Sequence, residues 1–477
     1  MINLKHTRKT ALIIALITPL ISGCSTQNLT TAIESAGHFE ANLIPLQNAE
    51  TLLYNHQEHT GTHSQTLLNH PLTAKTAIKL TLLENQDLKA QWQNIGIKQA
   101  DLMQAGLLKN PMIELSTLFA EHGGSANITV ALLASLSDLL QKPFTKKIAA
   151  HDLEREKLRI AALLIAKASE THKAYINHQS AIQKAHTVKT SYAIRKAALK
   201  LSTELLNAGN ISQYEHDQRA NALHLAYKDK LTATSEVKQT RAQLNEAMGL
   251  AVADQNKWRI TTRLAPLPNQ NISPHKTKQI ALQNSLAIAM ARQDLLRFAA
   301  KHQLQRQKNI IPDLDLGVEF ERNEGEKEVG PLAELTIPIF DHGQARRLKA
   351  DYELKQREAN LTAAIRKTAQ RATYLAEKRR DEQKLLTHYD QNIVPSAKRV
   401  QQGALKQYNA MQKGAFALLD AKHQTLNLQQ EKTKLIHQIW RTDIELKALL
   451  AGHLSTEALS PIALNSKAPT QETAGEH

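Results

Sequence analysis

The sequence predicts a mainly α-helical protein that contains two amphipathic β-hairpins and is built from two copies of one structural unit. The clearest hairpin signal lies between residues 313 and 339, where apolar and acidic residues alternate as in strands with one apolar and one acidic face. A charged, glycine-containing turn is expected within this hairpin, and the alternation resumes at Ala333. A second alternating stretch lies about two hundred residues earlier. Long helical segments follow both stretches, and the low content of Gly (17), Pro (14) and aromatic residues (4%) favours helices.

The chain begins with the features of a lipoprotein signal sequence. Basic residues precede an apolar run over residues 11–21, and the run ends in Ile21-Ser22-Gly23-Cys24. Residues 1–23 are therefore expected to be removed, which leaves a lipid on Cys24. An ordinary signal peptide followed by a buried thiol is the alternative. Cys24 is the only cysteine in the sequence, so no disulfide is expected within the chain.

The formal net charge of +15 indicates an anionic partner, either nucleic acid or a membrane surface. The signal sequence favours the membrane, and no nucleic-acid partner is expected. After residue 24, no segment contains the ~18 to 20 uninterrupted apolar residues that a transmembrane helix requires. If the chain crosses a bilayer, it must therefore do so as a closed β-barrel.

The first repeat is expected at residues 73–250. Residues 24–72 are polar and weakly patterned, and we interpret them as a tether between the lipid and the folded part. The repeat opens with a helical segment, and its strands are predicted at about 111–136. The long helical run that follows, from about Phe144 to Leu206, would extend ~90 Å. A turn containing Gly209 then reverses the chain, and a shorter helix returns.

The second repeat is expected at residues 276–452, after a proline-containing connector at 251–275. Its strands are predicted at about 312–339, and its long helical run is followed by a turn containing Gly414. Apolar and small residues at 3-4 spacing in both returning helices indicate coiled-coil packing. Residues 453–477 are rich in Ser, Thr, Pro and Glu and are expected to form an irregular tail.

Three segments resemble the TolC-like outer-membrane efflux family, and the resemblance covers nearly the whole mature chain. They are LENQDLKAQWQNIGIKQADLMQAGLLKNP before the first hairpin, ELTIPIFDHGQARRLKA at the end of the second, and QYNAMQKGAFALLDAKHQ around the second turn. The resemblance implies a homotrimer in which each chain contributes four strands to a twelve-stranded membrane β-barrel. An α-helical coiled-coil tunnel would continue this barrel across the periplasm.

The resemblance also implies a cellular location and partners. The location is the outer membrane of a Gram-negative bacterium, and Ser25 after the lipidated cysteine is consistent with the sorting of bacterial lipoproteins to that membrane. The implied partners are a periplasmic adaptor protein, an inner-membrane pump and outer-membrane lipid. The pump would supply the energy, and the channel would conduct its substrate passively.

Within such a barrel, the two faces of the second hairpin would meet different surroundings. The apolar residues from Leu314 to Phe320 would face lipid. The acidic residues would line the pore lumen; they are Asp313, Asp315, Glu319, Glu321 and Glu334. Two basic clusters follow the hairpins, at residues 142–147 and 346–349. We interpret them as contacts to lipid phosphates at the inner leaflet, with solvated helix ends as the alternative.

The periplasmic tip is the second candidate site. In the family, acidic residues near the tip constrict the pore and bind cations. Ala417 departs from the family pattern, because many relatives carry an acidic residue there. Solvated helix caps are the alternative interpretation. Matched by position to the turn glycines Gly209 and Gly414, the tip residues would be Glu215, Asp217, Lys413 and Asp420.

No enzymatic motif is present in the sequence: GxSxG, P-loop and HExxH patterns are all missing. We therefore expect no enzyme, no catalytic residue and no cofactor other than the lipid on Cys24. The 21 histidines include His56, His59, His63 and His70, whose spacing could place three on one helical face. We interpret them as solvent-facing residues and expect no metal site.

The function that follows is a trimeric outer-membrane efflux channel for drugs or metal ions. The outer component of a protein secretion system is a variant with the same architecture. A structural coiled-coil periplasmic lipoprotein without a pore is an alternative of a different class. That alternative explains the long helices equally well, but it does not explain the two hairpins. The sequence does not identify the substrate.

Overall fold

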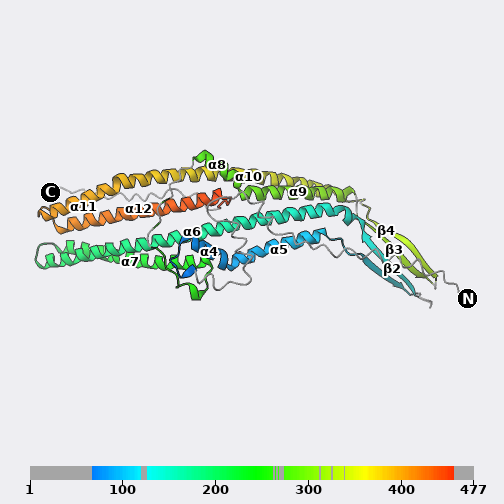
Figure 1. Cartoon of the computed structure of the whole chain (residues 1–477), viewed down its shortest axis with the longest axis horizontal. Coiled ribbons are helices and arrows are strands. Elements are labelled where there is room, and N and C mark those ends of the chain that lie inside the picture. Colours follow the sequence, from blue (N-terminus) through cyan, green and yellow to red (C-terminus); the bar gives the residue numbers. More distant parts are fainter. Residues whose placement is uncertain are drawn as a thin grey trace.

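The computed structural model describes residues 67–119, 126–261, 264, 267, 273–310, 313–323, 326–337 and 339–455. The predicted signal sequence, Cys24, most of the expected tether and most of the expected tail lie outside these residues. Long helices run side by side along the longest axis of the molecule, and a small sheet lies at one end of them (Figure 1). Within the described residues, no helix combines the length and the apolar composition needed to cross a membrane.

Elements follow one another in the same order twice. The first half contains α4 (Ala74–Glu84), α5 (Gln86–Gly106), β1 (Met112–Leu118), β2 (Asn127–Ser135), α6 (Leu136–Asn207) and α7 (Gln213–Met248). After the 3-10 turn η3 (Val252–Asp254), the second half contains α8 (Pro274–Asn284), α9 (Leu286–Ile310), β3 (Leu314–Asn323), β4 (Glu326–Leu335), α10 (Gln344–His388), α11 (Val394–Asn409) and α12 (Ala415–Leu450). A π-helical segment, η4 (Tyr389–Ile393), joins α10 to α11, whereas α6 runs as one α-helix for 72 residues.

The returning helices, α7 and α12, each end beside the junction of the two helices that open the same half of the chain. For α7 this is the junction of α4 and α5, and for α12 it is the junction of α8 and α9. Asn85 separates α4 from α5 and caps α5 by accepting a hydrogen bond from the Leu88 N–H. Gly249, after α7, has φ +68°, and a Cβ there would lie 2.7 Å from the Asn85 Cα. Gly452, after α12, has φ +107°, and its Cβ would lie 2.4 Å from the Asn284 carbonyl oxygen. Both the positive φ and the close approach require glycine at these positions.

The sheet joins the two halves of the chain. Its strand order is β1-β2-β3-β4, and all neighbours are antiparallel. β4 begins at Glu326, earlier than the alternation around Ala333 indicates, so Glu326 and Glu328 belong to a strand and not to a long charged turn. The outer edges of β1 and β4 have no strand partner within the described residues of this chain. Unpaired backbone groups at such edges favour pairing with another strand.

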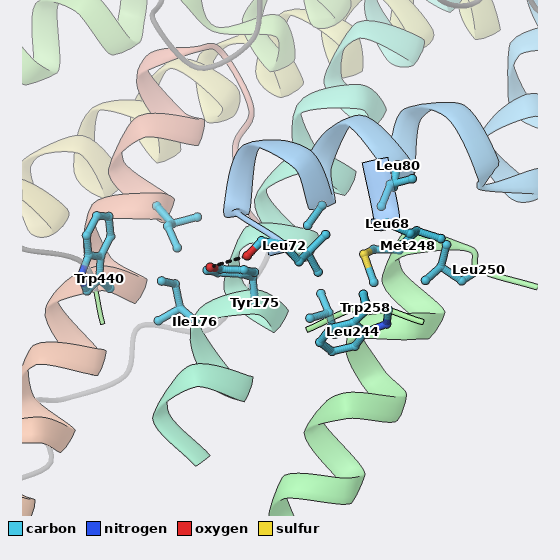
Figure 2. Packing of buried hydrophobic residues seen from close by; sticks show 12 residues of the cluster. Leu68, Leu72, Leu80, Tyr175, Ile176, Leu244, Met248, Leu250, Trp258 and Trp440 are labelled. Atoms are coloured by element: carbon cyan, nitrogen blue, oxygen red, sulfur yellow. Dashed lines mark hydrogen bonds between the residues drawn. The ribbon is translucent and has the colours of Figure 1, made fainter. Parts of the chain in front are cut away.

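The largest apolar cluster lies midway along the helices, where α4, α6, α7 and α12 meet (Figure 2). Leu72 and Trp258 are buried in it, and the Tyr175 hydroxyl donates a hydrogen bond to the Leu72 carbonyl oxygen at 3.1 Å. Both the expected tether and the expected connector therefore contribute side chains to this cluster. Core side chains come from Leu68, Leu72 and Trp258. A single large apolar residue in a polar stretch leaves no periodic pattern, so its burial is not visible in the sequence.

Candidate functional site

The register of the sheet separates an apolar face from an acidic one. Val130 lies opposite Phe320, and Leu132 lies opposite Val318. The exposed apolar side chains of this face favour an apolar environment. The other face carries no Lys or Arg among the described strand residues. Its acidic side chains are Glu114, Asp315, Glu319, Glu321, Glu326, Glu328 and Glu334.

The acidic face brings carboxylates together. Asp315 lies directly opposite Glu334, and Glu321 lies directly opposite Glu328. Like charges in directly opposed positions destabilise a sheet, and water reduces this repulsion through its high dielectric constant. The pairs therefore favour an aqueous surrounding for this face.

The predicted lumen residues lie where the alternation places them. Asp315, Glu319, Glu321 and Glu334 share the acidic face, and Asp313 immediately precedes β3, where its carbonyl oxygen accepts the Thr336 N–H. Glu114, Glu326 and Glu328 were missed by sequence reasoning. The first is a lone acid in an apolar strand, and the other two lie in a segment interpreted as a turn. Counting every second residue back from Glu334 along the strand would have placed Glu328 and Glu326 on the acidic face.

At the opposite end of the molecule, two helix–turn–helix tips lie beside each other (Figure 1). The α6–α7 tip contains Gly209 at φ +73°, a conformation that glycine adopts without strain. At the α11–α12 tip the left-handed residue is Met411, at φ +58°, and its side chain is 94% exposed. Gly414 caps α12 with an ordinary φ of −71°. In the second turn, Met411 and not Gly414 therefore adopts the left-handed conformation.

The predicted acidic tip residues have different surroundings. Glu215 completes a capping box: its carboxylate accepts the Ser212 N–H at 2.9 Å, and its own N–H donates to the Ser212 hydroxyl. The Ser212 N–H and the Ser212 hydroxyl, which donate to the carboxylate at 2.9 and 3.1 Å, lower the pKa of the Glu215 carboxyl. Asp217 accepts a hydrogen bond from Gln213. Lys413 is exposed and forms no ion pair with the described residues.

Asp420 alone among the predicted tip residues links the two helical hairpins. From α12, its carboxylate accepts hydrogen bonds from Arg195 of α6 at 3.1 Å and Arg219 of α7 at 3.4 Å. The Arg219 guanidinium also lies 4.6 Å from the centre of the Phe416 ring. We call these four residues the tip clasp. Sequence reasoning missed both arginines and Phe416, because their partners are distant in the sequence.

A second ionic contact between the halves lies near the central core. Glu445 of α12 contacts Lys173 of α6 at 3.1 Å through one carboxylate oxygen and Arg371 of α10 at 3.0 Å through the other. All three side chains are largely buried, so the charges depend on one another for stabilisation. Nearby, burial lowers the pKa of His172 and of His437 to about 4, so both rings are uncharged at neutral pH.

The candidate metal ligands are dispersed in the part of the chain that the structure describes. There, no three side chains among His, Cys, Asp and Glu lie close enough together to hold a metal ion. Of the histidines clustered in the sequence, His56, His59 and His63 lie outside the described residues. His70 is exposed just before α4.

The fold defined by this helical body and terminal sheet is that of the TolC-like outer-membrane channels. CusC, whose crystal structures concern folding and transmembrane channel formation, matches with a TM-score of 0.66 and 17% identity over 83% of this chain and 96% of CusC. The outer membrane protein VceC from Vibrio cholerae matches with a TM-score of 0.66 and 14% identity over 80% of this chain and 96% of VceC. The Campylobacter jejuni outer membrane channel CmeC matches with a TM-score of 0.64 and 15% identity over 87% of this chain and 89% of CmeC.

No protein-family model and no curated protein sequence matches the chain. At the identities above, the structural likeness establishes the fold. The mainly helical architecture and the resemblance to the TolC-like fold are thereby confirmed.

Proposed function

We propose that this chain is the outer-membrane channel of a tripartite efflux system. The observation that carries the proposal is the terminal sheet, which combines two unpaired edges with one apolar and one acidic face. Four strands are too few to close a pore. Pairing of β4 with β1 of the next chain around a threefold axis would give a closed twelve-stranded barrel and leave no edge.

In this assembly, the apolar face contacts lipid and the acidic face lines the lumen. The helices of three chains continue the pore as a periplasmic tunnel, and the tips dock a periplasmic adaptor that connects to an inner-membrane pump. The chain performs no bond chemistry and needs no cofactor. It conducts drugs or metal ions delivered by the pump, and a lipid on Cys24 anchors its N-terminal tether in the outer membrane.

The tip clasp is the part of the assembly that restricts opening. It holds the α11–α12 hairpin against the α6–α7 hairpin within one chain through Asp420, Arg195 and Arg219. Glu215 and Asp217 lie on the same tip but take no part in the clasp. Glu215 therefore acts first as a helix cap, and any role in constricting the pore requires contacts between chains.

The oligomeric state and conductance of the purified full-length protein test this function. In detergent, its mass is expected to be that of a trimer, and after insertion into a planar bilayer it is expected to conduct ions in discrete steps. A monomer that gives no current would contradict the proposal and favour the structural lipoprotein. A conducting trimer whose deletion leaves drug and metal resistance intact but blocks secretion of a protein would favour the secretion variant.

A further inference from the structure

The junction between sheet and helices carries a concentration of basic residues. We define the junction belt as residues 104–110, 136–150, 303–310 and 339–350, which flank the strand ends. Its only acidic residues are Asp138 and Asp341, and each already pairs with a base of the belt, at 2.6 Å to Lys109 and 2.5 Å to Arg346. The basic residues of the belt are Lys109, Lys142, Lys146, Lys147, Arg306, Lys308, Arg346, Arg347 and Lys349.

Most of this basic charge is available to an external partner. Lys146, Lys147, Arg347 and Lys349 are exposed, and none of them forms an ion pair with a described residue. The Arg347 guanidinium has only a long hydrogen bond, at 3.4 Å, to the His342 carbonyl oxygen. Among the described residues, these four exposed bases therefore carry positive charge that no ion pair neutralises.

Large apolar side chains are exposed between these bases. Phe340 is 92% exposed, and Leu140 and Leu348 are also exposed. Leu140 follows the end of β2 at Ser135, and Phe340 follows the end of β4 at Leu335. Apolar side chains beside long basic ones suit a lipid–water interface, because the former enter the acyl region while Lys and Arg extend to the phosphates.

From this arrangement we propose that the junction belt binds the anionic phospholipids of the periplasm-facing leaflet in preference to zwitterionic ones. The inference rests on the proposed function, which places the sheet in the membrane and the helices in the periplasm. The preference follows from charge: phosphatidylglycerol carries a net negative charge that uncompensated Lys and Arg attract, whereas phosphatidylethanolamine carries none.

The test compares two variants of the full-length protein in lipid nanodiscs that contain equal amounts of phosphatidylglycerol and phosphatidylethanolamine. In the belt variant, Lys146, Lys147, Arg347 and Lys349 are all replaced by Gln. The matched control replaces four exposed lysines towards the two tips, which also lack an ion pair with a described residue, by Gln: Lys200, Lys398, Lys406 and Lys422. After re-extraction in detergent, the retained lipids are quantified by mass spectrometry.

Wild type and tip control are expected to retain phosphatidylglycerol selectively, and the belt variant is expected to lose this selectivity by a factor on the order of ten. Equal selectivity in all three proteins, or the same loss in both variants, would overturn the inference. Trimer mass and conductance are measured on the same samples. If the wild type conducts but does not select phosphatidylglycerol, only the inference about lipid binding by the junction belt is wrong. If the wild type forms no channel, the proposed function is wrong, and the inference that rests on it fails as well.

Discussion

Replacing Glu445 with glutamine is expected to lower the free energy of unfolding by about 3–5 kcal/mol. The carboxylate contacts Lys173 and Arg371 at 3.1 and 3.0 Å, and all three side chains are largely buried. Glutamine has nearly the same shape but no charge, so the buried Arg371 guanidinium would lose its carboxylate partner and Lys173 would lose one of its partners. Denaturant unfolding of the detergent-solubilised protein, followed by the helical circular dichroism signal, measures the loss.

The control for this variant is Glu170→Gln on α6. Glu170 pairs with Lys167 at 3.0 Å, but its side chain is 59% exposed, and a surface pair of this kind contributes only about 0–1 kcal/mol. If Glu445→Gln and Glu170→Gln unfold at the same denaturant concentration, Glu445 does not hold the two halves of the chain together.

Replacing Asp420 with asparagine is expected to raise the mean conductance of the channel several-fold. Asparagine keeps the shape of the side chain but removes the charge that attracts Arg195 and Arg219. Asp420 is about half exposed, so each pair stabilises the closed tip by at most about 1 kcal/mol. Losing both would shift the balance between closed and open tips roughly tenfold. Single-channel recordings in planar bilayers measure the open probability and the current.

A matched control for the tip clasp is Asp229→Asn. Asp229 lies on α7, is exposed, and pairs only with its neighbour Lys228 at 3.5 Å among the described residues. Its conductance is expected to equal that of the wild type. Asp420→Asn recordings indistinguishable from those of the wild type and of Asp229→Asn would show that the clasp does not restrict the pore.

Local patterns in the sequence predicted the elements of the fold well. Alternation from Leu314 to Phe320 is a period-two signal that only a strand satisfies, and the register confirms both of its faces. Turn positions were also found, since Ser212 and Gly414 both cap returning helices. The left-handed Met411 could not be predicted, because methionine rarely adopts this conformation and leaves no signal in the sequence.

The residues that hold the molecule together are separated by long stretches of chain. Arg195 and Asp420 meet across 225 residues, and Lys173 and Glu445 across 272. Charged residues are common on helices of this kind, and no local spacing shows which of them will pair after folding. The sequence therefore indicates Asp420 as a residue close to the second turn, but not its partners Arg195 and Arg219.

Trp258 shows a related limit. It lies among prolines and polar residues, where the sequence indicates a connector, yet the side chain is almost fully buried and donates a hydrogen bond to Asn245 at 2.8 Å. A single aromatic residue carries no periodicity, so its burial depends on the shape of the cavity that distant helices form. The same applies to Leu72, whose side chain is buried in the same cluster and whose N–H donates to the Arg259 carbonyl oxygen at 2.7 Å (Figure 2).

In the proposed channel, the acidic face of the sheet lines a water-filled pore and the apolar face does not. Glu319 and Val318 are consecutive in β3 and lie on opposite faces, so Glu319→Cys and Val318→Cys form a matched pair. Each protein is inserted into a planar bilayer and treated with a charged, water-soluble thiol reagent, with the wild type as control for Cys24. The reagent is expected to change the conductance of Glu319→Cys only. A change in Val318→Cys, or no change in either variant, would contradict it.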